Sequence, residues 1–174
     1  MIPPVPYPST YWVVPARFLA GDHPGDTDWQ VRTPRLSALL GAGIRTFLDL
    51  TEEHEMNSYQ RALRGLAEDR HIEITYVRIP IPDQSVPSVW TQRRILDVID
   101  RSVADENPVF VHCFAGLGRT GTVAGCYLKR HGLATDEDVL HKIAELRRLT
   151  PAGREPSPQT LEQIRLVRHW KQGV

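Results

Sequence analysis

The chain has few cysteines, no long apolar run and no net charge, and each of these absences excludes a class of protein. Two cysteines are too few for a disulfide framework, so we expect free thiols in a reducing compartment. No apolar run approaches the roughly 20 residues of a membrane-spanning helix, and the proline-rich start holds no apolar stretch typical of a secretory signal. The 21 basic residues balance the 21 acidic ones, which argues against a nucleic-acid partner. The sequence therefore predicts a cytoplasmic protein without a membrane anchor.

The chain also shows no sign of a repeat, a second domain or a histidine cluster. Its 174 residues fit one domain with a substantial core, and the hydrophobic fraction of 41% is ordinary for a globular protein. Residues 1–9 contain four prolines, which exclude a helix or a central strand. We expect an extended arm over 1–9 and a single domain over 10–174. The seven histidines lack metal-ligand spacing, so we expect no metal and no cofactor.

Short apolar runs alternate with amphipathic segments along this domain. Strands are expected at 11–14, 17–21, 43–50, 74–80 and 108–112, the first two as a hairpin at a sheet edge. Helices are expected at 33–40, 57–70, from Ser88 onward, and at 118–131, 135–149 and 157–170. This alternation predicts an α/β fold, with a mostly parallel, twisted sheet of four to five strands and helices on both faces.

Three loops are expected at the carboxyl ends of the predicted strands, where α/β sheets bind their ligands. They cover residues 51–53, 82–84 and 112–119. Because these ends meet at one edge of a parallel sheet, the three loops should lie close together.

The segment from Cys113 to Arg119 combines a nucleophile with an anion receptor. It follows an apolar strand and opens a helix, and its five inner residues are Phe114, Ala115, Gly116, Leu117 and Gly118. So short a loop, with two glycines, can point its N–H groups inward, and the helix adds its positive end. These groups stabilise a thiolate and bind phosphate oxygens, while Arg119 adds a bidentate fork. We therefore expect the loop to hold phosphate, sulfate or vanadate.

The sequence HCFAGLGRT resembles the signature loop of the protein tyrosine phosphatase superfamily, HCxxGxxR followed by Ser or Thr. The small size of the chain is similar to the dual-specificity branch, and the resemblance covers most of the chain. It implies the fold of that superfamily and hydrolysis of phosphomonoesters through a phosphocysteine intermediate. The implied substrates are phosphorylated proteins or peptides, carrying phosphotyrosine and also phosphoserine or phosphothreonine.

The resemblance implies a general acid on a mobile loop upstream of the cysteine. Asp83, in the segment IPIPDQSVP, lies thirty residues before Cys113. It would protonate the leaving oxygen as the thiolate attacks phosphorus, and then deprotonate the water that hydrolyses the phosphocysteine. Asp83 could instead only initiate a proline-flanked turn, and Asp49 and Glu53 are the competing acids.

Four more polar residues match functional positions of that superfamily. The resemblance implies that Thr120 donates a hydrogen bond to the thiolate and that His112 orients the loop through backbone contacts. The segment PQTLEQI is similar to a QTxxQ segment that helps place the hydrolytic water, with Gln159 and Gln163 in the matching places. The two glutamines could equally be polar residues in the first turn of the last helix.

Other polar residues near the predicted site have weaker assignments. Glu52 or Glu53 could hold Arg119 in orientation, although exposed acids are more often solvated. Cys126 could resolve an oxidised Cys113, but its apolar neighbours favour a core cysteine.

Two other functions share the same loop chemistry. A phosphoinositide or inositol-phosphate phosphatase usually carries lysines inside the signature loop, whereas the five inner residues are uncharged here. Three arginines expected near the rim keep that function open, namely Arg147, Arg148 and Arg154. A pseudophosphatase that only binds phosphorylated partners typically loses the cysteine, the arginine or the acid, and this sequence has all three. Rhodanese-like and arsenate-reducing enzymes fit the histidine, the glycines and the separate upstream acid poorly.

Overall fold

The computed structural model of the protein describes residues 2–174, so Met1 of the predicted arm lies outside the described residues. Five strands and six helices fall within this range. The strands are β1 (Thr10–Val14), β2 (Phe18–Gly21), β3 (Thr46–Asp49), β4 (Thr75–Arg78) and β5 (Val109–His112). The helices are α1 (Trp29–Gly41), α2 (Gln60–Glu68), α3 (Val89–Ala104), α4 (Gly118–Arg130), α5 (Val139–Arg147) and α6 (Leu161–His169).

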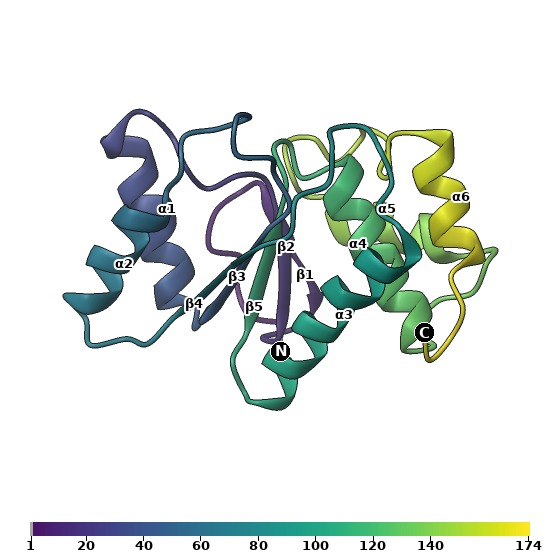
Figure 1. Ribbon diagram of the computed structural model, residues 1–174, viewed down its shortest axis with the longest axis horizontal. Coiled ribbons are helices and arrows are strands. Elements are labelled where there is room, and N and C mark those ends of the chain that lie inside the picture. Colours follow the sequence, from purple (N-terminus) through teal and green to yellow (C-terminus); the bar gives the residue numbers. More distant parts are fainter. Residues whose placement is uncertain (1) are drawn as a thin grey trace.

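The strands form one mostly parallel sheet in the order β1-β2-β5-β3-β4. The pairs β2–β5, β5–β3 and β3–β4 are parallel, and β1 pairs with β2 antiparallel as the predicted edge hairpin. Helices α1 and α2 cover one face, and α3 to α6 lie on the other (Figure 1). The predicted α/β class, the number of strands and the helices on both faces are confirmed.

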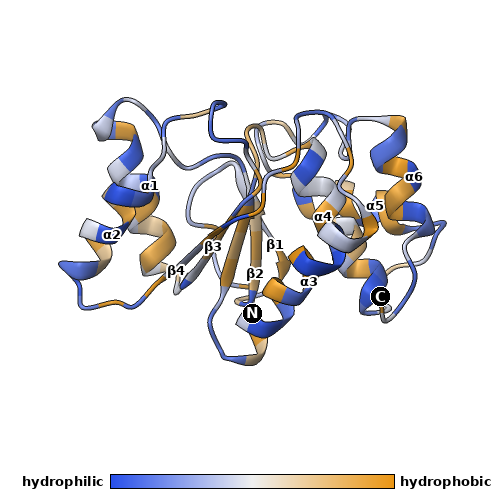
Figure 2. Cartoon of the chain, viewed as in Figure 1, coloured by the Kyte–Doolittle hydropathy of each residue, from blue (hydrophilic) through white to orange (hydrophobic). Residues whose placement is uncertain are grey.

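The inner strands β2, β3 and β5 are buried at every position and mostly apolar because helices cover both faces of the sheet, whereas the edge strand β4 is more polar and only partly buried (Figure 2). Neighbouring residues of a strand point to opposite faces, so Phe47 and Phe110 belong to the cluster beneath α1 and α2. Leu48 and Val111 belong to the cluster on the face of α3, α4, α5 and α6. Two cores therefore fix the sheet from both sides and hold its carboxyl edge in place.

The last helix begins later than the sequence indicates. Ser157 is not its first residue; its hydroxyl instead donates to the Leu117 carbonyl at 2.7 Å. The helix begins at Leu161, where Thr160 and Gln163 form a reciprocal capping box. Likewise α1 begins before the expected Thr33, at Trp29, because the Asp28 carboxylate caps it by accepting from the Gln30 N–H.

The proline-rich arm packs against the domain at Tyr7. The Tyr7 ring is buried, and its hydroxyl donates to the Asp22 carbonyl at 3.2 Å. The indole N–H of Trp12 donates to the Pro4 carbonyl at 3.4 Å. Within residues 2–174, no helix combines the length and the apolar character needed to cross a membrane.

Candidate active site

The loop from Cys113 to Arg119 lies where β5 ends and α4 begins, against the end of β2. The His23 N–H donates to the Phe114 carbonyl at 3.0 Å. Gly116 has a φ of +70°, and a Cβ there would lie 2.6 Å from the carbonyl carbon of Gly21. Glycine is therefore required at position 116 both for its backbone angle and for its contact with β2.

Cys113 sits at the base of this loop with 3% of its surface exposed. The Thr120 hydroxyl donates to the Cys113 Sγ at 3.0 Å. The sulfur also lies at the N-terminal end of α4, which begins at Gly118. A hydroxyl donor and the positive end of a helix therefore both face the sulfur.

Arg119 is buried and is held by a carboxylate that the sequence interpretation did not select. Its two terminal nitrogens donate to the two carboxylate oxygens of Glu55 at 2.6 and 2.7 Å, and one also donates to the Ile81 carbonyl at 2.9 Å. The bonds from Arg119 lower the pKa of Glu55. The suggestion that Glu52 or Glu53 holds Arg119 is wrong. The Glu52 N–H instead donates to Glu55 Oε1 at 2.7 Å, which closes the turn that brings Glu55 back to Arg119.

Asp83 faces the cysteine loop from a turn that follows β4. Its Oδ1 lies 3.0 Å from the Arg119 guanidinium, and its side chain is 61% exposed. Asp49, a competing acid, is fully buried and accepts hydrogen bonds from Thr51, Tyr76 and Arg78. Asp49 therefore belongs to the support of the site, while Asp83 stands at its opening.

His112 lies under the loop in a buried polar network. Its Nδ1 is 3.1 Å from the Cys113 carbonyl, which can only accept, so Nδ1 carries the proton and the Tyr59 hydroxyl donates to Nε2 at 2.7 Å. Burial lowers the pKa of His112 to about 4. Burial of Asp49 opposes its ionisation, but the His112 ring and the hydroxyls of Thr51 and Tyr76 lower its pKa to about 2. The network therefore fixes a neutral imidazole beneath Cys113.

The neutral state of His112 predicts that folding stability falls on mild acidification. The unfolded chain gains a proton near the ordinary histidine pKa of 6.5, while folded His112 gains it only near pH 4. The contribution of His112 to the free energy of unfolding is therefore greatest above pH 6.5. It declines as the pH falls toward 4, by about 3 kcal/mol in total. Burial also lowers the pKa of His23, which adds a change of the same sign. Urea unfolding at a series of pH values measures the slope.

The control for this prediction is His112→Gln, which removes the titrating ring. The variant should be less stable at neutral pH and should show a shallower decline between pH 6.5 and 4. A wild-type free energy of unfolding that stays constant across this interval would contradict a neutral buried His112.

Both predicted glutamines lie against the cysteine loop. A Cβ added to Gly118 would approach the Gln159 Oε1 to 2.9 Å and the Gln163 amide to 3.1 Å. Gln159 is exposed, whereas Gln163 is fully buried. The C-terminal segment therefore reaches the site, and its two glutamines have different surroundings there.

A cavity of about 370 Å³ opens beside the loop, bordered by Phe114 to Leu117, His23 and Met56. Arg147 also lines it but is not a free cation at the rim, because it is buried and donates to the Ala152 and Glu155 carbonyls. Arg148 and Arg154 are exposed, but neither lines this cavity, and Arg148 lines a second cavity. Cys126 is fully buried, which raises the pKa of its thiol and agrees with a core cysteine.

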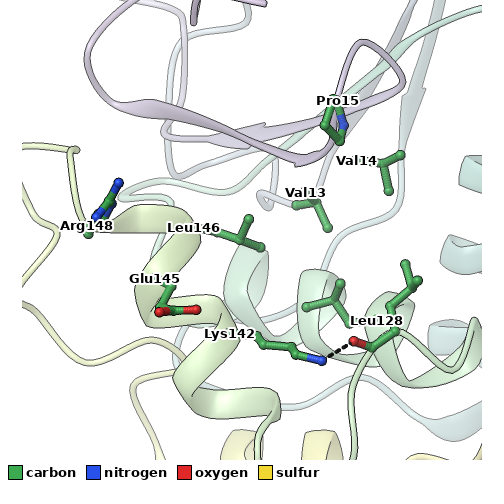
Figure 3. Close-up of a pocket in the computed structure, with 9 residues that line it drawn as sticks. Val13, Val14, Pro15, Leu128, Lys142, Glu145, Leu146 and Arg148 are labelled. Carbon is green, nitrogen blue, oxygen red and sulfur yellow. Dashed lines mark hydrogen bonds between the residues drawn. The ribbon is translucent and has the colours of Figure 1, made fainter. Parts of the chain in front are cut away.

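A second cavity, of about 630 Å³, lies between the β1–β2 turn and α5 (Figure 3). Its lining is mostly apolar, with Val13, Pro15, Leu128 and Leu146, and Lys142 donates to the Leu133 carbonyl at 2.5 Å beside it. Thr10 pairs with Gly21, so Val14 lies at the edge of the sheet opposite Cys113. This cavity is therefore separate from the candidate active site.

A mostly parallel sheet that passes through a Cys-x5-Arg loop into a helix, with an aspartate facing the loop, defines a protein tyrosine phosphatase-like domain. The chain belongs to the family described as polymorphic toxin system, DSP-PTPase phosphatase, which matches residues 25–133. The resemblance to small dual-specificity phosphatases is thereby confirmed.

Relatives with curated names include dual specificity protein phosphatases. The human protein CDC14A is 26% identical in an alignment 175 residues long, and this alignment covers 93% of this chain and 26% of that protein. The mouse protein CDC14B is 28% identical over 123 residues, which cover 69% of this chain and 24% of that protein. The chain thus spans about a quarter of the length of these relatives.

Solved structures of the same fold cover nearly the whole chain. Tk-PTP in its active form has a TM-score of 0.66 at 25% identity, over 95% of this chain and 97% of that one. PTPMT1, solved in complex with PI(5)P, has a TM-score of 0.68 at 17% identity, over 93% and 94% of the two chains. The second likeness concerns the fold alone.

Proposed function

We propose that the protein is a cysteine-dependent hydrolase of phosphomonoesters that acts on phosphotyrosine in proteins, and also on phosphoserine and phosphothreonine. One arrangement carries the proposal. The Cys113 sulfur, the Arg119 guanidinium and the Asp83 carboxylate meet at one edge of the sheet, with Thr120 at 3.0 Å from the sulfur and Asp83 at 3.0 Å from Arg119. Nucleophile, anion receptor and acid are therefore in reach of one phosphoryl group.

In the first step, the Cys113 thiolate attacks phosphorus and the bond to the ester oxygen breaks. Protonated Asp83 transfers its proton to the leaving oxygen, so the alcohol or phenol departs neutral. The N–H groups between Phe114 and Gly118 and the fork of Arg119 bind the other three oxygens of the transferring group. Glu55 binds the Nη1–Nη2 edge of the guanidinium through its two bonds, which leaves the Nε–Nη2 edge as the fork for the phosphate.

In the second step, water attacks the phosphocysteine and the S–P bond breaks, which regenerates the thiolate. Asp83, now a carboxylate, takes a proton from the attacking water, and inorganic phosphate leaves. We assign placement of this water to Gln159, which is exposed beside the loop. A reactive thiolate needs a reducing compartment, which supports a cytoplasmic location.

A phosphoinositide phosphatase is the second candidate, because PTPMT1 in complex with PI(5)P shares this fold. The inner loop residues from Phe114 to Gly118 offer no cation to a second phosphate. Among the three arginines considered for that purpose, Arg147 is buried and bound to backbone carbonyls. These observations favour a protein substrate.

A substrate panel with two inhibitors tests the proposal. We expect turnover of phosphotyrosine, phosphoserine and phosphothreonine peptides to exceed that of PI(5)P, and to proceed without metal. Vanadate should inhibit competitively, because it takes the geometry of the transferring phosphoryl group in the loop. EDTA should have no effect. Activity that EDTA abolishes and a divalent metal restores would overturn the mechanism, and a preference for PI(5)P would favour the second candidate.

A further inference from the structure

The buried side chain of Gln163 links the start of α6 to the turn that carries Asp83. Its Oε1 accepts from the N–H groups of Gln159 and Thr160 at 3.0 and 3.2 Å. Its Nε2 donates to the Ser85 carbonyl at 3.1 Å. One amide thus ties together two segments that are 78 residues apart in the sequence.

Ser85 closes the turn on which Asp83 stands. The Ser85 N–H and hydroxyl both reach the Pro82 carbonyl, at 3.1 and 2.8 Å. Within this turn, Gln84 has a φ of +58°. The Asp83 side chain is 61% exposed and forms an ion pair with Arg119, so little packing fixes its position. The backbone of the turn must therefore hold the acid in place, and Gln163 is bonded to that backbone.

The two N–H groups that donate to Gln163 also affect whether its side chain can place the hydrolytic water. A carbonyl oxygen has two lone pairs, and both lone pairs of Oε1 are engaged by backbone donors. Gln163 therefore has no acceptor left for a proton of an attacking water. Its contacts suit a brace on the acid turn better than a partner of the nucleophilic water.

We propose that Gln163 is a positioning residue, which holds the Asp83 turn over the cysteine loop through the Ser85 carbonyl. The inference rests on the proposed function, because the acid matters only if a leaving oxygen must be protonated. Loss of the brace would then slow formation of phosphocysteine for poor leaving groups. Loss of a water-placing residue would instead slow breakdown of phosphocysteine equally for all substrates.

Gln163→Glu is the sharpest variant. A glutamate keeps the acceptor for the Gln159 and Thr160 N–H groups and preserves the capping box, but its carboxylate cannot donate to Ser85. Gln163→Met removes this donor together with the Oε1 acceptor but adds no charge, so it separates loss of the brace from repulsion of phosphate. Thr160→Ala is the matched control. It removes the hydroxyl that accepts from the Gln163 N–H at 3.2 Å and leaves the Nε2 bond in place.

The kinetic readout is kcat/KM for aryl phosphates that differ in leaving group. Both Gln163 variants should lose about 10- to 100-fold with an unactivated phenol, and less than about 3-fold with nitrophenol. Thr160→Ala should keep the wild-type ratio between the two substrates. Equal losses of kcat/KM for both substrates would contradict the positioning role. A burst of nitrophenol with unchanged kcat/KM would contradict it too, and would indicate that Gln163 places the hydrolytic water.

A structural readout separates this inference from the proposed function. The Ser85 N–H reports on the turn, because it donates to the Pro82 carbonyl. Its hydrogen exchange should be about 5-fold faster in Gln163→Met, because the turn loses its bond from Gln163 to the Ser85 carbonyl, and unchanged in Thr160→Ala. Unchanged exchange in Gln163→Met would overturn the brace whether or not the protein is active. An inactive wild type with the expected exchange would overturn the proposed function alone.

Discussion

Replacing Cys113 with serine is expected to abolish turnover, with a loss of at least about 10⁴-fold in kcat. A serine hydroxyl is not ionised at neutral pH, so the loop keeps its anion receptor but loses its nucleophile. The substitution is nearly isosteric, and the Thr120 hydroxyl retains an acceptor in place of the sulfur at 3.0 Å. Initial rates with a phosphotyrosine peptide measure the loss, and calorimetric titration should show that vanadate or phosphate still binds.

Cys126→Ser is the control for this substitution. Cys126 is fully buried among apolar residues of α4, so a hydroxyl there should lower the melting temperature and leave turnover largely intact. The two serine variants thus separate chemistry from stability. Residual activity of Cys113→Ser above about a hundredth of wild type would contradict covalent catalysis.

Replacing Asp83 with asparagine is expected to cost about 10²- to 10⁴-fold in kcat/KM for substrates with a poor leaving group. Asparagine keeps the size and the acceptor oxygen but has no transferable proton. A reaction that needs an ionised nucleophile and a protonated acid follows a bell in pH, which we expect for the wild-type rate. In Asp83→Asn the alkaline limb should flatten, while the acid limb remains.

The leaving group separates this role from a general loss of structure. With nitrophenyl phosphate the loss should be much smaller, because a good leaving group departs with little proton transfer. Equal losses for both substrates, or an alkaline limb that persists, would show that another residue is the acid. Burial removes Asp49 from that role, so the exposed Glu53 would be tested next.

The elements that the sequence predicted well are those that depend on local patterns. The apolar runs that became β3 and β5 are short and bounded by polar turns, so burial between two layers of helices follows from their composition alone. The cysteine loop could also be located from the sequence, because the cysteine, the glycines and the arginine lie within one continuous segment. Ser88 caps α3 as expected, since its hydroxyl accepts from the Thr91 N–H three residues on.

The contacts that the sequence did not reveal join segments far apart in the chain. Glu55 lies 64 residues before Arg119, and its selection over Glu52 and Glu53 depends on how one turn closes. Among the partners of His112 and Asp49, Tyr59 directly precedes α2 and Tyr76 lies in β4, and neither belongs to a motif. The sequence places several acids near the carboxyl edge of the sheet, but only the folded loops decide which of them meets Arg119.

The backbone contact between Gly116 and Gly21 defines the smallest chain that can keep this site. Residues that match the family begin at 25 and end at 133. A chain cut to those limits would lose the hairpin whose end forms the wall of the cysteine loop, together with the His23 N–H that binds the Phe114 carbonyl. It would also lose Ser157, which binds the Leu117 carbonyl from the far side. Cys113, Arg119 and Asp83 all lie in the matched segment, but the shape of the cysteine loop depends on the flanks on either side.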